Sequence, residues 1–319
     1  MGLRHWRRRR LATWLLAGTL GAFLARDFLG QLYCSLLATL FLFLPACRIA
    51  SHPTYPSSMD FWHKVENGSA CGAETQLVIF VPSEPTHFHL RQAIRETWGN
   101  VKRPARLFFL VARSGLAYVD AAVGMDEQRT YGDVLMVDVV DSYANLTQKL
   151  VSGLRWIEAA CPAAQWLLRV DSDMMLSWNN LRRFLASGQA ASAGVMGYCR
   201  SYDCVCRLPY SKGCVNRNQV SLSIYPGYCF GFAYLLHRSA LRTAVQNSWS
   251  LDFRRRSYFH LDDIVLTALL LPATSKQHLP HLFDYQQTAH PSCPHSTLIV
   301  SKGFSHADQL RTFWLSQQC

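Results

Sequence analysis

Short apolar runs alternate with amphipathic segments between residues 77 and 188. Apolar runs bounded by polar residues predict buried strands, and apolar positions that recur every three or four residues predict helices. This alternation is typical of an α/β sheet with helices on both faces. The predicted strands are Leu77–Val81, Leu107–Ala112, Asp133–Val139 and Trp166–Val170, and the predicted helices are Arg91–Trp98 and one that starts at Leu146.

The pattern is less regular beyond Gly188, where segments rich in Cys, Gly and Tyr predict loops. Helical spacing returns in three places near the end of the chain: Arg238–Asn247, Asp262–Leu271 and Ala307–Leu315. The order of any later strands does not follow from the pattern.

Two apolar stretches lie at the front of the chain, Leu11–Ala25 and Phe28–Cys47, separated by Arg26 and Asp27. A membrane-spanning helix needs about 20 apolar residues, so the second stretch is long enough and the first is short. The basic run Arg7–Arg10 predicts a single span with the N-terminus in the cytosol. The sequence leaves open which stretch crosses. A cleaved signal peptide is the alternative, but no small-x-small site closes the first stretch cleanly.

The net charge of +11 raises the question of a nucleic-acid partner. Residues 1–50 contain seven Arg and one Asp, which account for +6 and leave the body at +5. A basic run that adjoins an apolar stretch is typical of the cytoplasmic flank of a membrane segment. We therefore expect no nucleic-acid partner and predict a membrane partner for the front of the chain.

The chain is long enough for one large domain behind an anchor. We expect a cytoplasmic tail and transmembrane anchor over residues 1–50 and a short stem over residues 51–75, since Ser51–Met59 is rich in Ser, Pro and Tyr. A single domain then occupies residues 76–319 on the far side of the membrane.

Eleven cysteines suit an oxidising compartment, and nine of them lie at or beyond Cys71. Paired CxxC spacing is absent, so disulfides are favoured over a zinc site. An odd number leaves at least one thiol free or bonded to another chain, which would allow a disulfide-linked homodimer. Five cysteines crowd into one segment: Cys199, Cys204, Cys206, Cys214 and Cys229.

Two N-x-S/T sequons, at Asn67 and Asn145, are candidate glycosylation sites. They agree with a domain that faces the lumen of the secretory pathway. Chance alone gives one or two such sequons in a chain of this length.

Asp171-Ser172-Asp173 follows directly after the predicted strand Trp166–Val170. Ligands of α/β sheets bind at the carboxyl ends of the strands, so these carboxylates are placed for ligand binding. A D-x-D pair can hold Mn²⁺ or Mg²⁺, and the metal can neutralise the diphosphate of a departing nucleotide. The structural alternative is an Asp pair in a turn or a helix cap.

Asp262 and Asp263 begin another predicted helix. Acidic residues in a first helical turn interact favourably with the helix dipole, which alone could explain them. One of them could instead be a general base that takes a proton from an attacking hydroxyl group. The sequence by itself leaves both interpretations open.

Five segments in chain order resemble the motifs of one enzyme family. They are Arg91–Gly99 (RQAIRETWG), Tyr131–Leu135 with Asp141–Lys149 (YGDVL and DSYANLTQK), Asp171–Met175 (DSDMM), Tyr225–Gly231 (YPGYCFG) and Asp262–Ile264 (DDI). The family is that of the β-1,3-galactosyltransferases and β-1,3-N-acetylglucosaminyltransferases, and the resemblance covers the chain from about Leu77 to Trp314.

This resemblance implies a GT-A-type fold and a type II Golgi membrane protein with its catalytic domain in the lumen. The implied reaction is inverting, metal-dependent transfer of a hexose or N-acetylhexosamine, with galactose favoured, from a UDP-sugar to a glycan hydroxyl group. The product would contain a β-1,3 linkage, and Mn²⁺ is the expected cation. The acceptor glycan would be carried by a glycoprotein or a glycolipid.

The motifs also assign roles to individual residues. Asp171 and Asp173 would hold the metal and, with Ser172, the donor phosphates, while Asp263 would be the catalytic base. The expected donor-nucleotide residues are Arg91, Arg95, Trp98 and Lys149. The expected acceptor-side residues are Tyr228, Gly231 and Asp262.

Three positions depart from the family pattern. Ser172 replaces the middle Asp of D-D-D and Asp262 replaces the Glu of E-D-V. Lys302 stands where the family often has a metal-binding His, and His306 lies four residues further on. These departures leave two alternatives: a catalytically silent member that binds UDP-sugar or assists another transferase, and a membrane-anchored lectin-like domain.

Overall fold

The computed structural model describes residues 29–37, 61–63, 71–101, 103–192, 194–209, 211–251, 260–284, 297–304 and 306–316. It contains two compact units. The larger unit comprises residues 49–201 and 226–319, and the smaller comprises residues 1–48 and 202–225.

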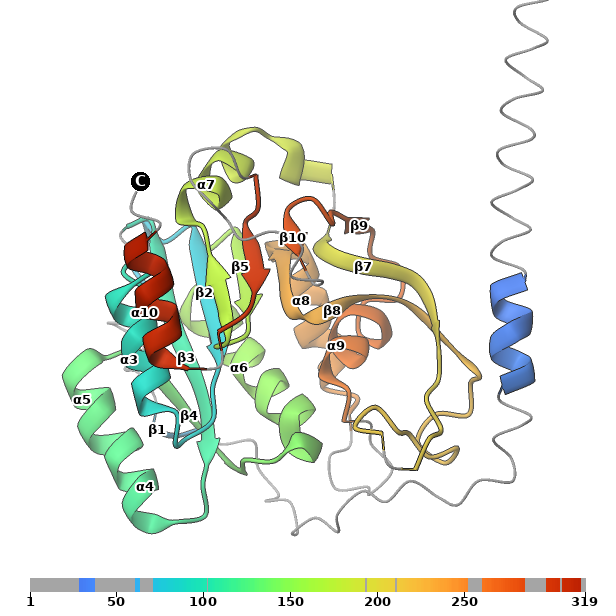
Figure 1. The fold of residues 1–319 in the computed structure, drawn as a ribbon, viewed down its shortest axis with the longest axis horizontal. Coiled ribbons are helices and arrows are strands. Elements are labelled where there is room, and N and C mark those ends of the chain that lie inside the picture. The colour runs from blue at the N-terminus through green and yellow to red at the C-terminus, as the bar shows by residue number, and fades with distance from the viewer. Residues whose placement is uncertain are drawn as a thin grey trace, which may run out of the picture. The chain divides into compact units, whose positions relative to one another are not determined.

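A mixed sheet of eight strands forms the centre of the larger unit (Figure 1). Strands β2, β3, β4 and β5 are parallel, and β8 pairs antiparallel with β5. The order along the sheet is β1 (Phe61–His63), β4 (Val134–Val140), β3 (Ala105–Arg113), β2 (Leu77–Pro82), β5 (Trp166–Val170), β8 (Ile224–His237), β7 (Val195–Cys204) and β9 (Lys276–His278).

Helices cover this sheet from two sides, as the apolar pattern predicts. Helices α3 (Phe88–Glu96) and α10 (Ala307–Ser316) pack together on one face, and α6 (Leu146–Ala160) packs against β3 and β4 (Figure 1). Further helical segments are α4 (Ala117–Ala121), η2 (Ala122–Glu127), α5 (Gln128–Tyr131), η3 (Tyr143–Asn145), α7 (Trp178–Ala186), η4 (Gln189–Ser192) and α8 (Arg238–Ser248).

A smaller sheet combines β6 (Met174–Leu176), β10 (Phe283–Asp284) and β11 (Val300–Lys302). Strand β11 pairs antiparallel with β6, so the backbone of Lys302 lies opposite Met174. The C-terminal part of the chain is thereby brought beside the loop that follows β5.

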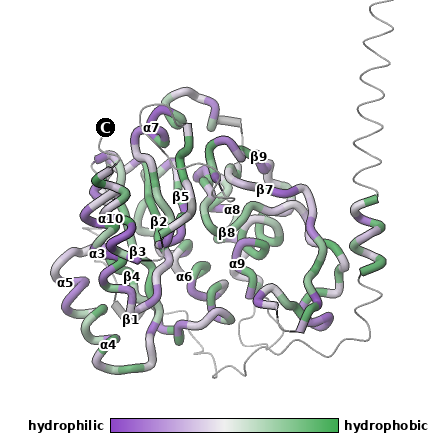
Figure 2. The backbone as a smooth tube through the Cα atoms, in the orientation of Figure 1, coloured by the Kyte–Doolittle hydropathy of each residue, from purple (hydrophilic) through white to green (hydrophobic). Residues whose placement is uncertain are grey.

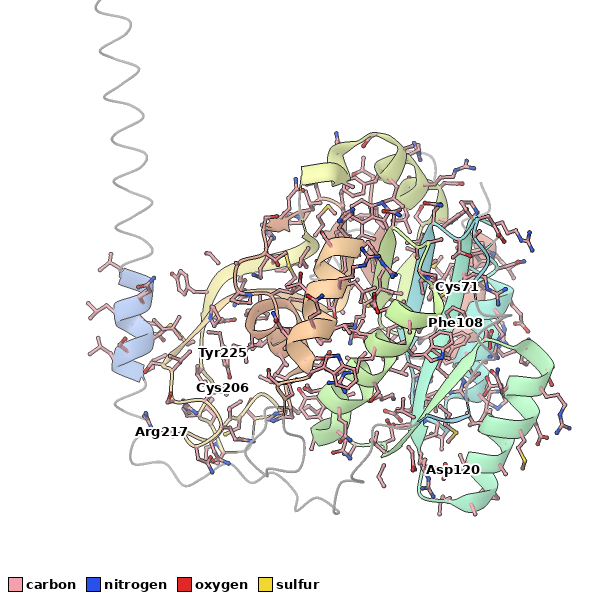
Figure 3. The ribbon with its side chains drawn as sticks, turned by 180° about the vertical axis from the view of Figure 1, so that it is seen from behind. Cys71, Phe108, Asp120, Cys206, Arg217 and Tyr225 are labelled. Carbon is pink, nitrogen blue, oxygen red and sulfur yellow. A yellow bond between two sulfur atoms is a disulfide. The ribbon has the colours of Figure 1, made fainter. Side chains whose placement is uncertain are left out.

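Buried apolar side chains pack on both faces of the main sheet, in one cluster with α3 and α10 and, on the other face, with α6. Buried apolar residues run without a break along β2, and the backbone in Figure 2 is correspondingly green through the central strands. Phe108 on β3, labelled in Figure 3, makes an edge contact with Trp156 on α6 at 5.2 Å between ring centroids. Such fully buried strands are expected for a parallel sheet covered on both faces.

The α/β class is confirmed, and most predicted elements appear within a few residues of their expected bounds. The helix predicted over Asp262–Leu271 is different in kind. It begins as α9 (Asp262–Ile264) and continues as the π-helix η5 (Val265–Leu269). The wider turn is one that helices often adopt beside functional sites.

Disulfides were favoured over zinc, and the structure contains Cys71–Cys161, Cys199–Cys229 and Cys34–Cys204. Cys214 is also disulfide-bonded, whereas Cys206 is the one free thiol among the cysteines that the structure describes. Cys34 lies in Phe28–Cys47, one of the two stretches that could cross the membrane, and its partner Cys204 belongs to the same compact unit.

In the smaller unit, residues 29–37 form a helix. Within the part of the chain that the structure describes, no helix combines the length and the apolar character needed to cross a bilayer.

Gly153 allows α6 to approach the sheet, since a Cβ atom there would lie 2.1 Å from Cζ of Phe80. We predict that Gly153→Leu destabilises the protein by about 1–3 kcal/mol, because a packed core resists added volume. Thermal unfolding of the purified chain measures this loss. Ala159→Leu, at an exposed position of the same helix, is the matched control. Equal unfolding temperatures for the two variants would contradict the packing described.

Candidate functional site

The carboxyl ends of β2 and β5 form the place where a ligand is expected. Strand β2 pairs with β3 along one edge and with β5 along the other. The strand order therefore reverses at β2, since β3 and β4 extend the sheet in one direction and β5 extends it in the other. In open α/β sheets such a reversal of strand order opens a crevice at the carboxyl ends of the two strands. The segments that leave these two strands are Ser83–Pro85 and Asp171–Asp173.

The loop of Asp171 and Asp173 is held by backbone hydrogen bonds on both sides. The amide of Asp171 donates to the carbonyl of Phe232 on β8 at 2.9 Å. The amide of Phe304 donates to the carbonyl of Asp173 at 3.1 Å. Both carboxylates and Ser172 remain partly exposed, so they are available to a ligand.

Asp263 lies against the same stretch of β8. Its Oδ2 accepts from the amide of Gly231 at 3.2 Å, and its Oδ1 accepts from the amide of Ile264 at 2.8 Å. A Cβ atom at Gly231 would lie 3.3 Å from Cβ of Asp263, so a larger residue would crowd this carboxylate. Because Gly231 and Phe232 are adjacent, Asp263 and the D-x-D loop belong to one site.

Arg169 links the two acidic motifs directly. Its Nη1 lies 2.9 Å from Oδ1 of Asp171, and its Nη2 lies 3.5 Å from Oδ2 of Asp262. The side chain is only 6% exposed and lies 5.9 Å from the ring centroid of Tyr234. The contact with Asp171 is an ion pair without hydrogen-bond geometry, and Nε makes no hydrogen bond within the described part of the chain. One buried cation therefore contacts both motifs.

The crowding of charge shifts the protonation of this site. Burial raises the pKa of Asp171 to about 7, Arg169 opposes the rise, and Asp173 and Asp262 add to it. Burial, followed by the charge of Asp262, raises the pKa of Asp263 to about 7. A carboxylate whose pKa lies near neutral pH is well suited to act as a general base.

The charges of Asp262 and Asp263 also act on Tyr143. Burial and the charges of Asp262 and Asp263 raise the pKa of its hydroxyl group to about 12. Its ring lies 5.4 Å from that of His260, measured between centroids. The D-S-Y motif that contains Tyr143 thus reaches the same site as the D-x-D loop.

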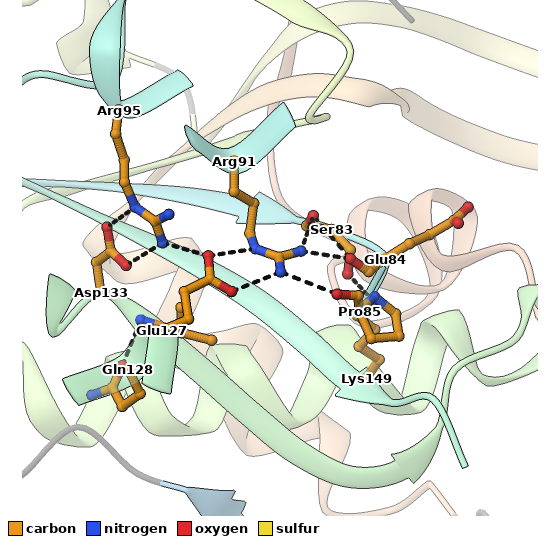
Figure 4. Close-up of polar contacts among 10 residues, drawn as sticks. Ser83, Glu84, Pro85, Arg91, Arg95, Glu127, Gln128, Asp133 and Lys149 are labelled. Carbon is orange, nitrogen blue, oxygen red and sulfur yellow. Dashed lines mark hydrogen bonds and ion pairs between the residues drawn. The ribbon is translucent and has the colours of Figure 1, made fainter. Parts of the chain in front are cut away.

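A second charged network lies behind the loop that follows β2 (Figure 4). Arg91 is fully buried, and Nε and Nη2 donate to the carboxylate of Glu127 at 2.9 and 2.7 Å. Nη1 donates to Oγ of Ser83 and the carbonyl of Glu84, and Nη2 also donates to the carbonyl of Pro85. In this conformation Arg91 has no exposed surface and supports the loop, and its expected contact with the donor nucleotide stays a prediction.

Lys149 supports the same loop from α6. Its Nζ donates to the carbonyl of Ser83 and to Oδ1 of Asp141, both at 2.8 Å, and the side chain is 3% exposed. Lys149 thus positions this loop, and its expected contact with the donor stays a prediction.

Arg95 and Trp98 are likewise occupied within the fold. Arg95 pairs with Asp133 and Glu127 at 2.8 Å and lies 4.0 Å from the ring centroid of Tyr131. Trp98 is 2% exposed and belongs to the core. Both side chains complete the packing of α3 in this conformation, and a donor contact would require them to move.

The remaining predicted residues lie in mixed surroundings. Tyr228 is buried beside the Cys199–Cys229 disulfide, which joins β7 to β8. Asn145 is 3% exposed and its Nδ2 donates to the carbonyl of Val140 at 2.7 Å, so a glycan there would have to displace this bond. His306 is exposed, and the sequon at Asn67 lies outside the described residues.

Sequence reasoning missed Arg169, Tyr143, Tyr234 and Glu127. A signal for Arg169 was present, because side chains two apart on a strand point to the same side, which relates Arg169 to Asp171. Glu127 gave no comparable signal, since its partner Arg91 lies 36 residues away.

The residues present fit a divalent cation that takes only some of its ligands from the protein and the others from the substrate phosphates. In the described part of the chain, no group of three or more His, Cys, Asp or Glu side chains could hold a metal ion. Mg²⁺ commonly binds one or two carboxylates together with substrate phosphates, and Asp171 and Asp173 supply such a pair. Their hard oxygen atoms suit Mg²⁺ or Mn²⁺.

Comparison with known proteins gives a consistent result. A family model described as Galactosyltransferase matches residues 89–278. The human UDP-GalNAc:beta-1,3-N-acetylgalactosaminyltransferase 1 is 26% identical over 266 residues, which cover 80% of this chain and 78% of that protein. The human Beta-1,3-galactosyltransferase 5 is 30% identical over 192 residues, which cover 59% of this chain and 60% of that protein.

Among solved structures, the similarity is weaker. A mannosyltransferase from Pyrobaculum calidifontis in complex with GDP-Man and Mn²⁺ has a TM-score of 0.38 at 13% identity. The match covers 81% of this chain and 65% of that one.

Removal of the buried cation should destabilise the fold in a pH-dependent way. We predict that Arg169→Met costs about 3–5 kcal/mol near neutral pH, because Asp262 loses its buried partner. Without Arg169 the pKa values of Asp171 and Asp262 rise further. Since protonation relieves the unpaired charge, the deficit should shrink as the pH falls from about 8 to about 5.

Unfolding of the variants across this pH range provides the measurement. Arg169→Lys keeps a positive charge and should recover part of the loss. Arg242→Met removes the exposed partner of Glu158 and should cost at most about 1 kcal/mol. A loss for Arg169→Met that is independent of pH would show that its charge is not what stabilises the cluster.

Proposed function

Because the chain belongs to the galactosyltransferase family, we propose that it transfers a sugar from a UDP-sugar to a hydroxyl group of a glycan acceptor. The transferred sugar is a hexose or an N-acetylhexosamine, with galactose favoured. The anomeric carbon is inverted and a β-1,3 linkage forms. We further assign the GT-A type to its α/β fold.

The observation that carries this proposal is the ion-paired position of Arg169 between the two acidic motifs. Its guanidinium contacts Asp171 and Asp262, and Asp263 adjoins Asp262. A donor diphosphate beside Asp171 and Asp173 would therefore lie within one site with a carboxylate base. A lectin-like domain only binds a sugar. It has no need for a carboxylate beside a diphosphate together with a second carboxylate whose pKa lies near 7.

The donor side consists of Asp171, Ser172 and Asp173 together with the loop that Arg91 and Lys149 support. Asp171 and Asp173 would hold the divalent cation, Mn²⁺ favoured, which when bound supplies charge neutralisation of the departing diphosphate. Arg95 and Trp98 hold α3 in place, Arg95 through its ion pairs and Trp98 through packing in the core. The supported loop can then present its backbone to the nucleotide without rearrangement, which favours catalysis through preorganisation.

The acceptor side consists of Asp262, Asp263, Tyr228 and Gly231. The acceptor oxygen forms a bond to the anomeric carbon while the bond from that carbon to the diphosphate oxygen breaks. The electron pair of the breaking bond leaves with UDP, and the proton of the acceptor hydroxyl group passes to the carboxylate of Asp263. The amides of Gly231 and Ile264 fix this carboxylate and leave it lone pairs for the proton.

We place this reaction in the Golgi lumen, in a type II membrane protein whose tail and anchor lie within residues 1–50. Residues 51–75 serve as stem and residues 76–319 as catalytic domain. The disulfides of the larger unit suit an oxidising lumen. A homodimer stays a prediction.

The proposal is tested by release of UDP from a set of UDP-sugars, with the full chain, Mn²⁺ and glycan acceptors. We predict that Asp263→Asn lowers kcat by about 10²–10⁴-fold, the usual contribution of a general base, while donor binding persists. Asp173→Ala should instead weaken metal-dependent UDP binding. Asp308→Asn on α10, 96% exposed, is the matched control and should be neutral.

Linkage analysis of the product decides the β-1,3 assignment. Metal-dependent UDP binding without turnover in the wild-type chain would identify a silent family member. The absence of both UDP binding and turnover would leave only the lectin-like alternative.

The shifted pKa of Asp263 gives a separate prediction for the pH profile. The base must be deprotonated, so kcat/KM should fall as the pH decreases through about 7. Asp262 raises this pKa by charge repulsion, so Asp262→Asn should move the acidic limb to lower pH. The profiles are measured at saturating Mn²⁺, so that Asp171 and Asp173 stay ionised. A limb that does not move would exclude Asp263 as the titrating base.

A further inference from the structure

The helix of residues 29–37 is joined to the segment 202–225 at two neighbouring points. Cys34 forms a disulfide with Cys204, with 5.1 Å between their Cα atoms. One turn earlier, a Cβ atom at Gly30 would lie 1.9 Å from the hydroxyl oxygen of Tyr202. Residues four apart on a helix share a face, and residues two apart on a strand share a side. The two contacts therefore support each other.

This pairing is incompatible with a membrane span over Phe28–Cys47. In such a span, Cys34 would lie about 20 Å below the lumenal end of the helix, at 1.5 Å per residue. Cys204 would have to enter the hydrocarbon to the same depth. Disulfides also form in oxidising compartments, so both thiols must reach the lumen.

The sequence around Cys204 makes entry into hydrocarbon costly. Asp203 and Arg207 flank it closely, and Lys212 and Arg217 follow in the same unit. A charged side chain at the centre of a bilayer costs about 2.5–3.5 kcal/mol even on the scales that give low values. The alternative span, Leu11–Ala25, is shorter than the bilayer core. Long Arg side chains at both of its ends and local thinning compensate for such a mismatch at modest cost.

We infer that Leu11–Ala25 is the segment that crosses the membrane and that residues 29–37 form a lumenal helix clamped to Cys204. One exposed face of this helix is apolar and fits the lumenal surface of the bilayer. It displays Leu29, Leu32, Tyr33 and Leu36, which are 46–62% exposed and follow helical spacing. A helix of this kind lies in the plane of the interface. The inference concerns topology and stands whether or not the chain transfers a sugar.

Disulfide mapping tests the clamp. The full chain is expressed in a secretory-pathway host, its thiols are blocked, and non-reduced peptides are identified by mass spectrometry. A peptide that links Cys34 to Cys204 is expected. It should vanish in Cys34→Ser and persist in Cys206→Ser, the control at the free thiol. Absence of the link from the wild-type protein would overturn the inference.

Paired lysine substitutions test which stretch crosses. Leu16→Lys with Leu20→Lys should release the protein from carbonate-washed membranes, because charges enter the proposed span. Leu40→Lys with Leu44→Lys makes the same change at the same spacing in the second stretch and should leave the protein membrane-bound. Release by the second pair, or retention of the first, would overturn the inference.

Discussion

The site depends on the position of one buried positive charge among four carboxylates. Arg169 is nearly inaccessible, yet it ion-pairs with Asp171 and lies near Asp262. Burial lowers the pKa of its guanidinium, but the neighbouring carboxylates outweigh this effect and raise it. The guanidinium therefore stays charged. Without it, Asp171, Asp173, Asp262 and Asp263 would repel one another at the point where two separate parts of the chain meet.

Strand β8 makes this meeting possible, because its backbone contacts both acidic segments through consecutive residues. Phe232 accepts from the amide of Asp171, and Gly231 donates to Asp263. The hydroxyl of Thr267 adds a further tie, since it accepts from the amide of Cys229 at 2.9 Å and donates to the carbonyl of Asp263 at 2.6 Å. The Cys199–Cys229 disulfide then joins this part of β8 to β7. The base is fixed mainly by backbone groups, and Gly231 leaves room for it, since a Cβ atom at this position would lie 3.3 Å from Cβ of Asp263.

The sequence predicts the parallel strands well because a fully apolar run has few alternatives to a buried strand. It also brings Asp171 to the carboxyl end of β5, since that position follows from strand length alone. It does not reveal the surroundings of Arg91, because the motif alone does not show whether this side chain is buried or exposed. The decisive partner, Glu127, lies on η2 and is found only when the chain has folded. The π-helical turn at Val265–Leu269 could not be predicted either, because the apolar spacing of this segment fits an α-helix equally well.

The two buried charge networks suggest a common principle for this fold. A buried ion pair is a weak source of stability, because desolvation offsets much of its Coulomb energy. The guanidinium of Arg91 satisfies its donors with Glu127 and with the loop at Ser83–Pro85, which leaves that loop little freedom to move. Arg169 limits the freedom of Asp171 relative to Asp262 in the same manner. Their common effect is geometric: each holds a loop at the carboxyl ends of β2 and β5, so that the crevice is shaped before any ligand arrives.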